Sequence, residues 1–295
     1  MAPPARLDLG AFADEIGVED AVTVVGGRTQ WGAGGMVAAG TREVRAPAGI
    51  VEFDPAEMTV RCGAGTTVRE VDEVLGAQGQ LVALPDAAGA TVGGVLAVGQ
   101  SGLRRLGYGP VRDVLLEARY ISAEGTLIKA GGPTVKNVSG FDLCRLLVGS
   151  LGTIGLLGEV CLRCRPRPAR SQWFAGEADP FALRRTLYRP TSMLWDGTTT
   201  WVLLEGHPAD VDAQARIAAL RPAEGPPPIP AAGRLSLRPS ELRSLTGEFV
   251  AEIGVGIVHV PHTAESSEPD RIDLHRRIKA AFDPTGRLNP GRRVA

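Results

Sequence analysis

The sequence predicts an α+β fold in which a large first domain is followed by a small α+β cap. Three observations support this prediction. Segments 49–53 and 58–62 flank Asp54 and Pro55, a pattern typical of an antiparallel hairpin. Residues 171–220 give the order strand, helix, two strands, helix, which indicates a ferredoxin-like layer. Glycine clusters recur between strands throughout the first half of the chain.

Composition narrows the class of protein. The chain has 295 residues, 44% of them hydrophobic, so it can bury a core in one large or two modest domains. A net charge of −1 with mixed acids and bases argues against a nucleic-acid binder. We expect no secretory signal and no transmembrane segment. The four cysteines are scattered, which is typical of reduced thiols in the cytoplasm.

The elements of the first domain follow from periodicity and capping. Thr66 and Thr67 supply hydroxyls and Glu70 a carboxylate at the start of a helix, as in a capping box. Valines and a leucine then recur at helical spacing. A second helix is expected at 141–148. Strands are expected at 21–25, 49–53, 58–62, 80–84, 111–122, 127–130 and 154–163.

The cap and tail are predicted in the same way. After a linker at 166–170, strands are expected at 173–175, 192–195 and 201–205, with helices at 180–188 and 209–220. Five prolines make 221–233 a stiff exposed loop. A last strand is expected at 252–260 and a basic helix at 270–282.

A strand followed by glycines and a helix is the outline of a dinucleotide site. Residues 63–68 resemble G-x-G-x-x-G and follow a strand, so a parallel, nicotinamide-binding sheet is one hypothesis. Against it, Val68 stands where the third glycine belongs, the strand before it pairs in a hairpin, and no further strand–helix alternation follows.

The other hypothesis distributes the phosphate site over several loops. Gly26, Gly27, Arg28 and Thr29 offer consecutive backbone N–H groups that can form an anion-binding nest. A second glycine cluster runs from Gly93 to Gly109, and a third includes Asn137, Gly140 and residues 149–155. Any one cluster can serve turns alone, whereas three in one half of a chain favour a ligand.

Four segments of the first domain carry a resemblance to a known family. They lie at 85–94, 107–113, 136–143 and 149–155, and include Lys-Asn-Val-Ser-Gly-Phe-Asp-Leu. Together they resemble FAD-binding domains of the PCMH type, the vanillyl-alcohol oxidase / p-cresol methylhydroxylase family. The third segment and the tail at 279–291 are similar to the FAD-binding (E) subunits of bacterial glycolate oxidases.

The resemblance implies a two-subdomain FAD-binding domain at 1–168, a small cap at 169–264, and a tail at 265–295 that returns to the FAD domain. It places the pyrophosphate at 26–30. Residues implied to bind the cofactor are Gly26, Gly27, Arg28, Thr29, Gln30, Pro85, Thr91, Val92, Gly93, Gly94, Ser101, Gly102, Tyr108, Gly109, Asp142, Gly152, Thr153, Ile154, Gly155 and Asn289.

The resemblance also implies a function: an FAD-binding subunit of a glycolate-oxidase-like 2-hydroxy-acid dehydrogenase. Its partners would be a homologous flavin subunit and an iron–sulfur subunit, in the cytoplasm or at the membrane periphery through those partners. FAD is expected to be non-covalent because 26–35 contains neither His nor Cys. A stand-alone FAD oxidoreductase and a flavin-free structural subunit stay open as alternatives.

No catalytic residue and no metal site are assigned from the sequence. Cys161 and Cys164 form a C-x-x-C without a second pair, so we interpret them as packing cysteines. His259 lies on an expected strand and is interpreted as a structural histidine, with a role as base or substrate ligand as the alternative.

Overall fold

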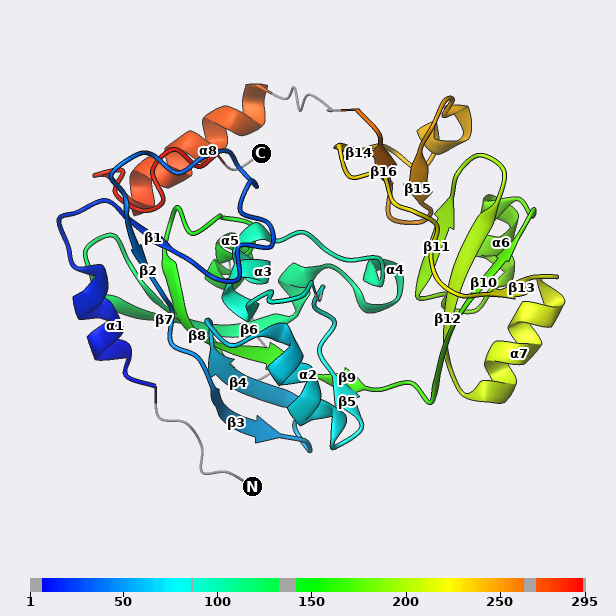
Figure 1. Cartoon of the computed structure of the whole chain (residues 1–295), viewed down its shortest axis with the longest axis horizontal. Coiled ribbons are helices and arrows are strands. Elements are labelled where there is room, and N and C mark those ends of the chain that lie inside the picture. Colours follow the sequence, from blue (N-terminus) through cyan, green and yellow to red (C-terminus); the bar gives the residue numbers. More distant parts are fainter. Residues whose placement is uncertain (1–6, 86, 133–141, 263–268, 294–295) are drawn as a thin grey trace. The chain divides into compact units, whose positions relative to one another are not determined.

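The computed structural model describes residues 7–85, 87–132, 142–262 and 269–293 (Figure 1). The chain divides into two compact units. The first comprises Met1–Ser101, Pro110–Arg167 and Glu268–Ala295, and the second comprises Gly102–Gly109 and Pro168–Ser267. A short segment, Gly102–Gly109, therefore belongs with the second unit although its flanks belong to the first.

A five-stranded antiparallel sheet forms the centre of the first unit. Its order is β3-β4-β8-β6-β7, with β3 at Ile50–Asp54, β4 at Thr59–Gly63, β8 at Leu156–Arg163, β6 at Leu115–Ile121 and β7 at Leu127–Gly131. β4 lies between β3 and β8 and is antiparallel to both. The alternative of a parallel dinucleotide-binding sheet is therefore wrong, and the expected hairpin is confirmed.

Three helices pack on one face of this sheet: α2 (Val68–Gly76), α3 (Val92–Val98) and α5 (Leu143–Leu147). Thr67, and not the preceding Thr66, is the N-cap residue of α2, and it forms a full capping box with Glu70. The side chains of Leu75 and Leu96 are fully buried against the strands. Burying apolar faces in this way supplies most of a domain's favourable folding free energy.

Helix α3 was not expected from the sequence because two of its residues are glycines, which are poor helix formers. Thr91 caps it by accepting a hydrogen bond from the Gly94 N–H. At Gly93 a Cβ atom would lie 2.8 Å from the carbonyl oxygen of Ala64. The glycine is thus required because the helix passes so close to the loop after β4.

The two ends of the chain meet in the first unit. Helix α1 (Leu9–Ile16) leads into β1 (Val22–Val24), which pairs in parallel with β2 (Arg42–Val44). After α8 (Pro269–Phe282) the chain returns to β1, where Val22 forms a parallel bridge with Leu288. In Figure 1 the red C-terminal segment lies beside the blue loops near β1. The expected return of the tail is confirmed.

Another short pair of strands in the first unit, β5 (Gln80–Leu81) and β9 (Arg165–Pro166), is antiparallel.

The strand expected at 111–122 begins later than predicted. Its first residues form a 3-10 turn, η1 (Val111–Asp113), in which the Val114 N–H donates to the Val111 carbonyl.

The second unit contains a seven-stranded sheet of order β13-β10-β12-β11-β15-β16-β14. Its first part runs β10 (Arg170–Gly176), α6 (Pro180–Thr186), β11 (Ser192–Trp195), β12 (Thr200–Gly206), α7 (Pro208–Ile217), β13 (Arg221–Ala223). These four strands are antiparallel neighbours, in the spatial order of a ferredoxin-like layer. β14 (Gly233–Ser236), β15 (Val250–Glu252) and β16 (Ile257–Val260) extend that layer, and α4 (Arg105–Tyr108) and η2 (Glu241–Ser244) also lie in this unit.

Two expectations for this unit were wrong. The expected strand 252–260 is a hairpin, β15 and β16, because Gly254 and Gly256 have φ values of 81° and 83° and reverse the chain. The start of the proline-rich stretch is the edge strand β13 rather than part of a loop. Proline is compatible with an edge strand because its missing N–H can face away from the sheet.

Candidate cofactor site

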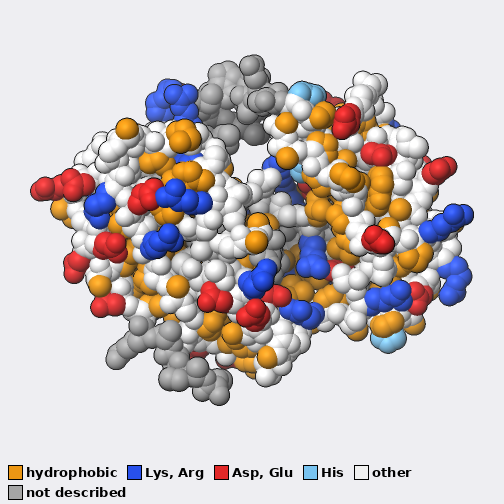
Figure 2. Space-filling view, in the orientation of Figure 1, with side chains coloured by type: hydrophobic (Ala, Val, Ile, Leu, Met, Phe, Trp, Pro, Cys, Tyr) orange, Lys and Arg blue, Asp and Glu red, His pale blue; other side chains and the backbone are white. Residues whose placement is uncertain are grey.

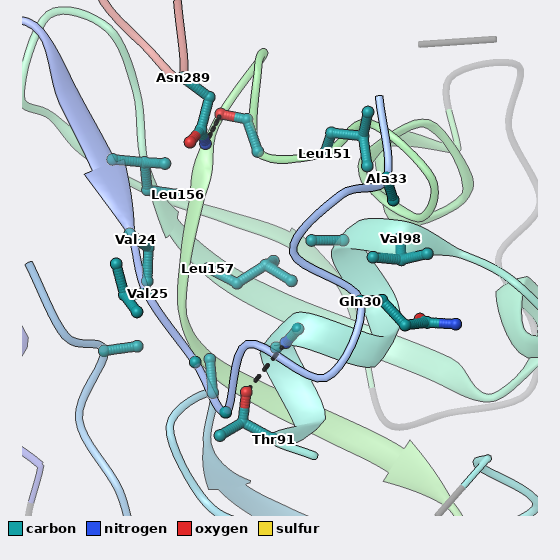
Figure 3. Close-up of a pocket in the computed structure, with 18 of the residues that line it drawn as sticks. Val24, Val25, Gln30, Ala33, Thr91, Val98, Leu151, Leu156, Leu157 and Asn289 are labelled. Carbon is teal, nitrogen blue, oxygen red and sulfur yellow. Dashed lines mark hydrogen bonds between the residues drawn. The ribbon is translucent and has the colours of Figure 1, made fainter. Parts of the chain in front are cut away.

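A pocket in the first unit gathers loops that are far apart in the sequence (Figure 3). The loop after β1 forms one wall, and the start of α3 with the loop after β4 forms another. The loop before β8 and the C-terminal segment complete it. The lining residues are Val24, Val25, Gly26, Gly27, Arg28, Thr29, Gln30, Trp31, Ala33, Ala46, Ala64, Gly65, Thr91, Gly93, Gly94, Ala97, Val98, Leu147, Ser150, Leu151, Gly152, Gly155, Leu156, Leu157, Asn289 and Arg292.

The loop at 26–30 lines this pocket and has unused backbone donors. The N–H groups of residues 26–30 donate no hydrogen bond to any other described residue, whereas the Val25 and Trp31 N–H groups do donate. Arg28 has a φ of 56°, a left-handed conformation that is uncommon for a residue with a side chain. Successive N–H groups with such a left-handed residue among them form a nest that favours an anion.

The start of α3 contributes differently. Its first N–H groups are already engaged: Val92 donates to the Thr66 carbonyl, Gly93 to Ala64 and Gly94 to the Thr91 hydroxyl. The donors open to an anion in this part of the pocket therefore come from the loop at 26–30 and not from the helix.

Glycines let the walls of the pocket approach one another. A Cβ atom at Gly26 would lie 2.2 Å from Thr91 Oγ1, and one at Gly27 would lie 1.7 Å from the Gly89 carbonyl oxygen. At Gly155 it would lie 2.5 Å from the ring of Tyr120. These glycines are required by close contacts within the protein, which in turn bring the free N–H groups to the pocket.

The rest of the lining is largely apolar. Leu151, Leu157 and Val98 line the pocket, and in Figure 3 the side chain of Leu157 lies within the curve of the loop at 24–33. An apolar wall beside a polar nest suits a ligand with a flat aromatic part and an anionic part, which is the composition of a flavin dinucleotide. The residues present therefore fit FAD.

Asn289 joins three segments at one edge of the pocket. Its side-chain amide donates to the Gly152 carbonyl at 3.1 Å, and its side-chain oxygen accepts from the Thr23 hydroxyl. Its own N–H donates to the Val22 carbonyl at 2.8 Å. Asn289 is buried, so each of these bonds is shielded from water.

The residues implied by the resemblance fall into three groups. Lining the pocket are Gly26, Gly27, Arg28, Thr29, Gln30, Thr91, Gly93, Gly94, Gly152, Gly155 and Asn289. Away from the lining are Pro85, Val92, Ser101, Asp142, Thr153 and Ile154, and the second unit holds Gly102, Tyr108 and Gly109.

Several of the residues away from the lining have a structural role. Val92 and Ile154 are part of the hydrophobic core, Ser101 accepts the Val111 N–H, and Asp142 caps α5. Asn137 and Gly140 lie outside the described residues.

Sequence reasoning missed most of the apolar lining. Val24, Val98 and Leu157 have the residue types of an ordinary core, and nothing in their spacing separates a pocket wall from a protein interior. Arg292 was not among the residues assigned to the cofactor, because only the fold brings it from the end of the chain to the loop after β1.

The cysteines are buried and unpaired. Burial raises the pKa of Cys62 and of Cys164 to about 12, so both thiols stay protonated at neutral pH. Within the residues that the structure describes, no group of His, Cys, Asp and Glu side chains could hold a metal ion.

The second unit has its own polar group on one face of its sheet. His259 and Arg234 are direct cross-strand partners on β16 and β14, and such partners place their side chains on the same face. Glu252 is buried and its Oε1 lies 2.8 Å from His259 Nε2. Burial lowers the pKa of Arg234, and nearby Glu252 opposes this shift.

Comparison with known protein families supports the assignment of this pocket to FAD. Residues 12–131 match the family of FAD binding domains, and residues 240–292 match the C-terminal domains of FAD linked oxidases. The chain therefore contains an FAD-binding domain and a C-terminal segment of the kind found in FAD linked oxidases. FAD is its cofactor, and the protein is an FAD-dependent oxidoreductase.

Relatives of this family align over very different lengths. The glycolate oxidase subunit GlcE of Escherichia coli is 29% identical over 86% of this chain and 87% of its own length. The D-lactate dehydrogenase of Archaeoglobus fulgidus is 37% identical, but over 40% of this chain and 27% of its own length. For the glycolate oxidase subunit GlcD of Bacillus subtilis the values are 34%, 40% and 26%.

Solved structures support the fold. An alkyldihydroxyacetonephosphate synthase superposes with a TM-score of 0.65 at 16% identity, covering 92% of this chain and 71% of that one. Among the described residues, no helix is both long and apolar enough to cross a membrane. Figure 2 shows acidic and basic side chains interspersed over the visible face.

Proposed function

We propose that this chain is the FAD-binding subunit of a 2-hydroxy-acid dehydrogenase of the glycolate oxidase kind. The observation that carries the proposal is the likeness to GlcE, which extends over 86% of this chain and 87% of that subunit. The D-lactate dehydrogenase and GlcD each align with 40% of this chain and with only 27% and 26% of their own length, so we expect this chain to work beside larger partners.

Within such a complex, FAD supplies when bound a flavin ring that takes up a hydride and passes the electrons on. The chain's own residues bind and orient it. We propose that the nest at 26–30 holds the pyrophosphate, and that Leu151, Leu157 and Val98 exclude water from the aromatic part. We also propose that FAD is held without a covalent bond, since the pocket lining contains no Cys or His side chain among the residues described.

The partners we propose are a homologous flavin subunit and an iron–sulfur subunit. Electrons that leave a flavin need a further acceptor, and the described residues offer no group of metal ligands for one. The proposed substrate is a small 2-hydroxy acid, as the names of the GlcE, GlcD and D-lactate dehydrogenase relatives indicate for those proteins.

A second candidate function is a stand-alone FAD-dependent hydroxy-acid oxidoreductase. One observation favours it: Arg234 and His259 share a face of the second unit's sheet, and Glu252 holds His259. A guanidinium can pair with a carboxylate, and an imidazole held by a carboxylate can accept a hydroxyl proton. Together they are suited to bind the carboxylate of a 2-hydroxy acid and to take the proton of its hydroxyl group.

Anaerobic reduction of the flavin distinguishes the two functions. The purified chain and the complex co-expressed with its two partners are each mixed with glycolate or D-lactate, and the visible absorbance of the flavin is followed. Acetate, which lacks the hydroxyl group, is the control, and dithionite gives the fully reduced signal. We expect 2-hydroxy acids to bleach the complex but not the chain alone.

Full bleaching of the chain alone would instead establish the stand-alone enzyme. A complex that dithionite reduces and no 2-hydroxy acid reduces would contradict the proposed substrate class.

A further inference from the structure

The C-terminal segment holds the loop that carries the nest. The Arg293 N–H donates to the Gly34 carbonyl at 2.8 Å, and the Ala38 N–H donates to the Pro290 carbonyl at 2.8 Å. A Cβ atom at Gly34 would lie 2.8 Å from the Arg293 carbonyl oxygen. The loop and the segment therefore fit against each other at main-chain distance.

Arg292 makes the densest set of contacts between them. Its Nη1 lies within hydrogen-bond distance of the carbonyl oxygens of Trp31, Ala33 and Gly35, the last at 2.6 Å. Its guanidinium also lies over the Trp31 ring, 4.6 Å from the centroid. Arg28 lies 4.9 Å from the centroid of the same ring. Contacts of this kind fix a loop conformation because the planar guanidinium offers several donors in a rigid arrangement.

The charge of Arg292 is not matched within the described residues. Arg28 is paired with Glu43, but no carboxylate lies within ion-pair distance of Arg292 in the described part of the chain. Arg292 lines the pocket, and burial lowers its pKa. A partly buried cation that only carbonyl dipoles satisfy is stabilised by any anion that enters beside it.

We propose that Arg292 is a cofactor-positioning residue: it fixes the loop that carries the nest at 26–30 and supplies the positive charge that the FAD diphosphate neutralises. The C-terminal segment is then part of the cofactor site. This role of Arg292 concerns cofactor binding only, so a test that contradicts the proposed substrate or partners would leave it unaffected.

Ligands with and without a diphosphate separate this role from a purely structural one. The test uses full-length wild type, Arg292→Ala, Arg292→Lys and the control Arg293→Ala, each stripped of flavin. Arg293 is the matched control because it is adjacent, exposed, and contributes its main chain rather than its side chain to the loop. FAD, ADP and riboflavin are titrated against each, with tryptophan quenching and flavin fluorescence as readouts.

We expect Arg292→Ala to weaken FAD and ADP binding by about 10- to 100-fold, the loss typical of a hydrogen bond to a charged group. Riboflavin carries no phosphate, so its binding is expected to change by less than about threefold. The affinity of Arg292→Ala for ADP should also depend less steeply on salt than that of wild type. Arg292→Lys keeps the charge and is expected to fall between, and Arg293→Ala to match wild type.

Two results would overturn the proposal. One is an Arg292→Ala protein that binds FAD and ADP as wild type does. The other is an equal loss for ADP and riboflavin with unchanged salt dependence, which would make the arginine a structural residue only. If Arg292→Ala does not fold, Arg292→Lys takes its place in the test. A lysine variant that binds FAD and ADP with wild-type affinity and wild-type salt dependence, but binds riboflavin more weakly, would likewise overturn the proposal.

Discussion

At the scale of single residues, the pocket depends on glycines that the protein itself requires. Gly26 and Gly27 border the pocket, yet the direction of their missing Cβ atoms is toward Thr91 and Gly89. The sequence indicated the right glycines for a partly different reason. Their lack of a side chain lets two loops pass in contact, and the free N–H groups of the nest follow from that passage.

Replacing Gly27 by alanine therefore tests the role of close packing. The added Cβ would lie 1.7 Å from the Gly89 carbonyl oxygen, so one loop must move. We expect the free energy of unfolding to fall by about 1–3 kcal/mol, as for overpacked sites, and FAD affinity to fall with it. Urea unfolding of the flavin-free protein and FAD titration measure the two effects.

Gly32 is the matched control for Gly27. It lies in the same loop, and a Cβ atom there would meet nothing within 4 Å. Gly32→Ala is expected to change stability by less than about 1 kcal/mol and to leave FAD binding intact. If Gly27→Ala behaves like Gly32→Ala, the close passage does not shape the site.

At the scale of elements, two caps of similar chemistry have different tasks. Thr67 caps α2 and Thr91 caps α3, each by accepting a backbone N–H. Thr91 also lines the pocket beside Gly26, whereas Thr67 does not. We expect Thr67→Ala and Thr91→Ala each to lower stability by about 1 kcal/mol, the usual contribution of a cap.

Only Thr91→Ala is expected to weaken FAD binding, because α3 and the loop at 26–30 share that side chain. Chemical unfolding and FAD titration of the two variants in parallel check this. Equal FAD affinities in both variants would show that α3 does not help to position the cofactor.

The elements also show what sequence reasoning could and could not supply. Strong local signals gave the hairpin at 49–62 and the ferredoxin-like order of the second unit, because alternation and capping act over a few residues. Helix α3 was missed because Gly93 and Gly94 oppose helix formation locally, and packing on Ala64 overrides that preference. The hairpin at 250–260 was missed because its turn falls inside one apolar run.

The site was harder to predict than the fold for a related physical reason. The nest at 26–30 can be predicted locally, because glycines next to Arg28 indicate a turn with a left-handed backbone. Trp31 and Arg292 are far apart in the sequence and come into contact only in the fold, so no local pattern predicts their contact. Apolar lining residues such as Leu157 have the composition of a core, so periodicity alone assigns them to one.

At the scale of the whole molecule, the first unit contains the cofactor pocket, and the second unit has a sheet that carries Arg234 and His259. The likeness to GlcE over nearly the full length of both chains favours a subunit of a larger assembly. The anaerobic reduction of chain and complex belongs at this scale, since it asks whether these two units suffice for the reaction.

The flavin content of the purified full-length chain tests the cofactor site without reference to substrate or partners. The protein is saturated with FAD, freed of excess by gel filtration, and denatured with acid, and flavin is then measured in the supernatant and in the pellet. We expect one FAD per chain, all of it released to the supernatant, and near-complete loss of that flavin in Gly27→Ala. A wild-type chain that folds but retains no FAD, or one whose flavin stays with the pellet, would contradict this expectation.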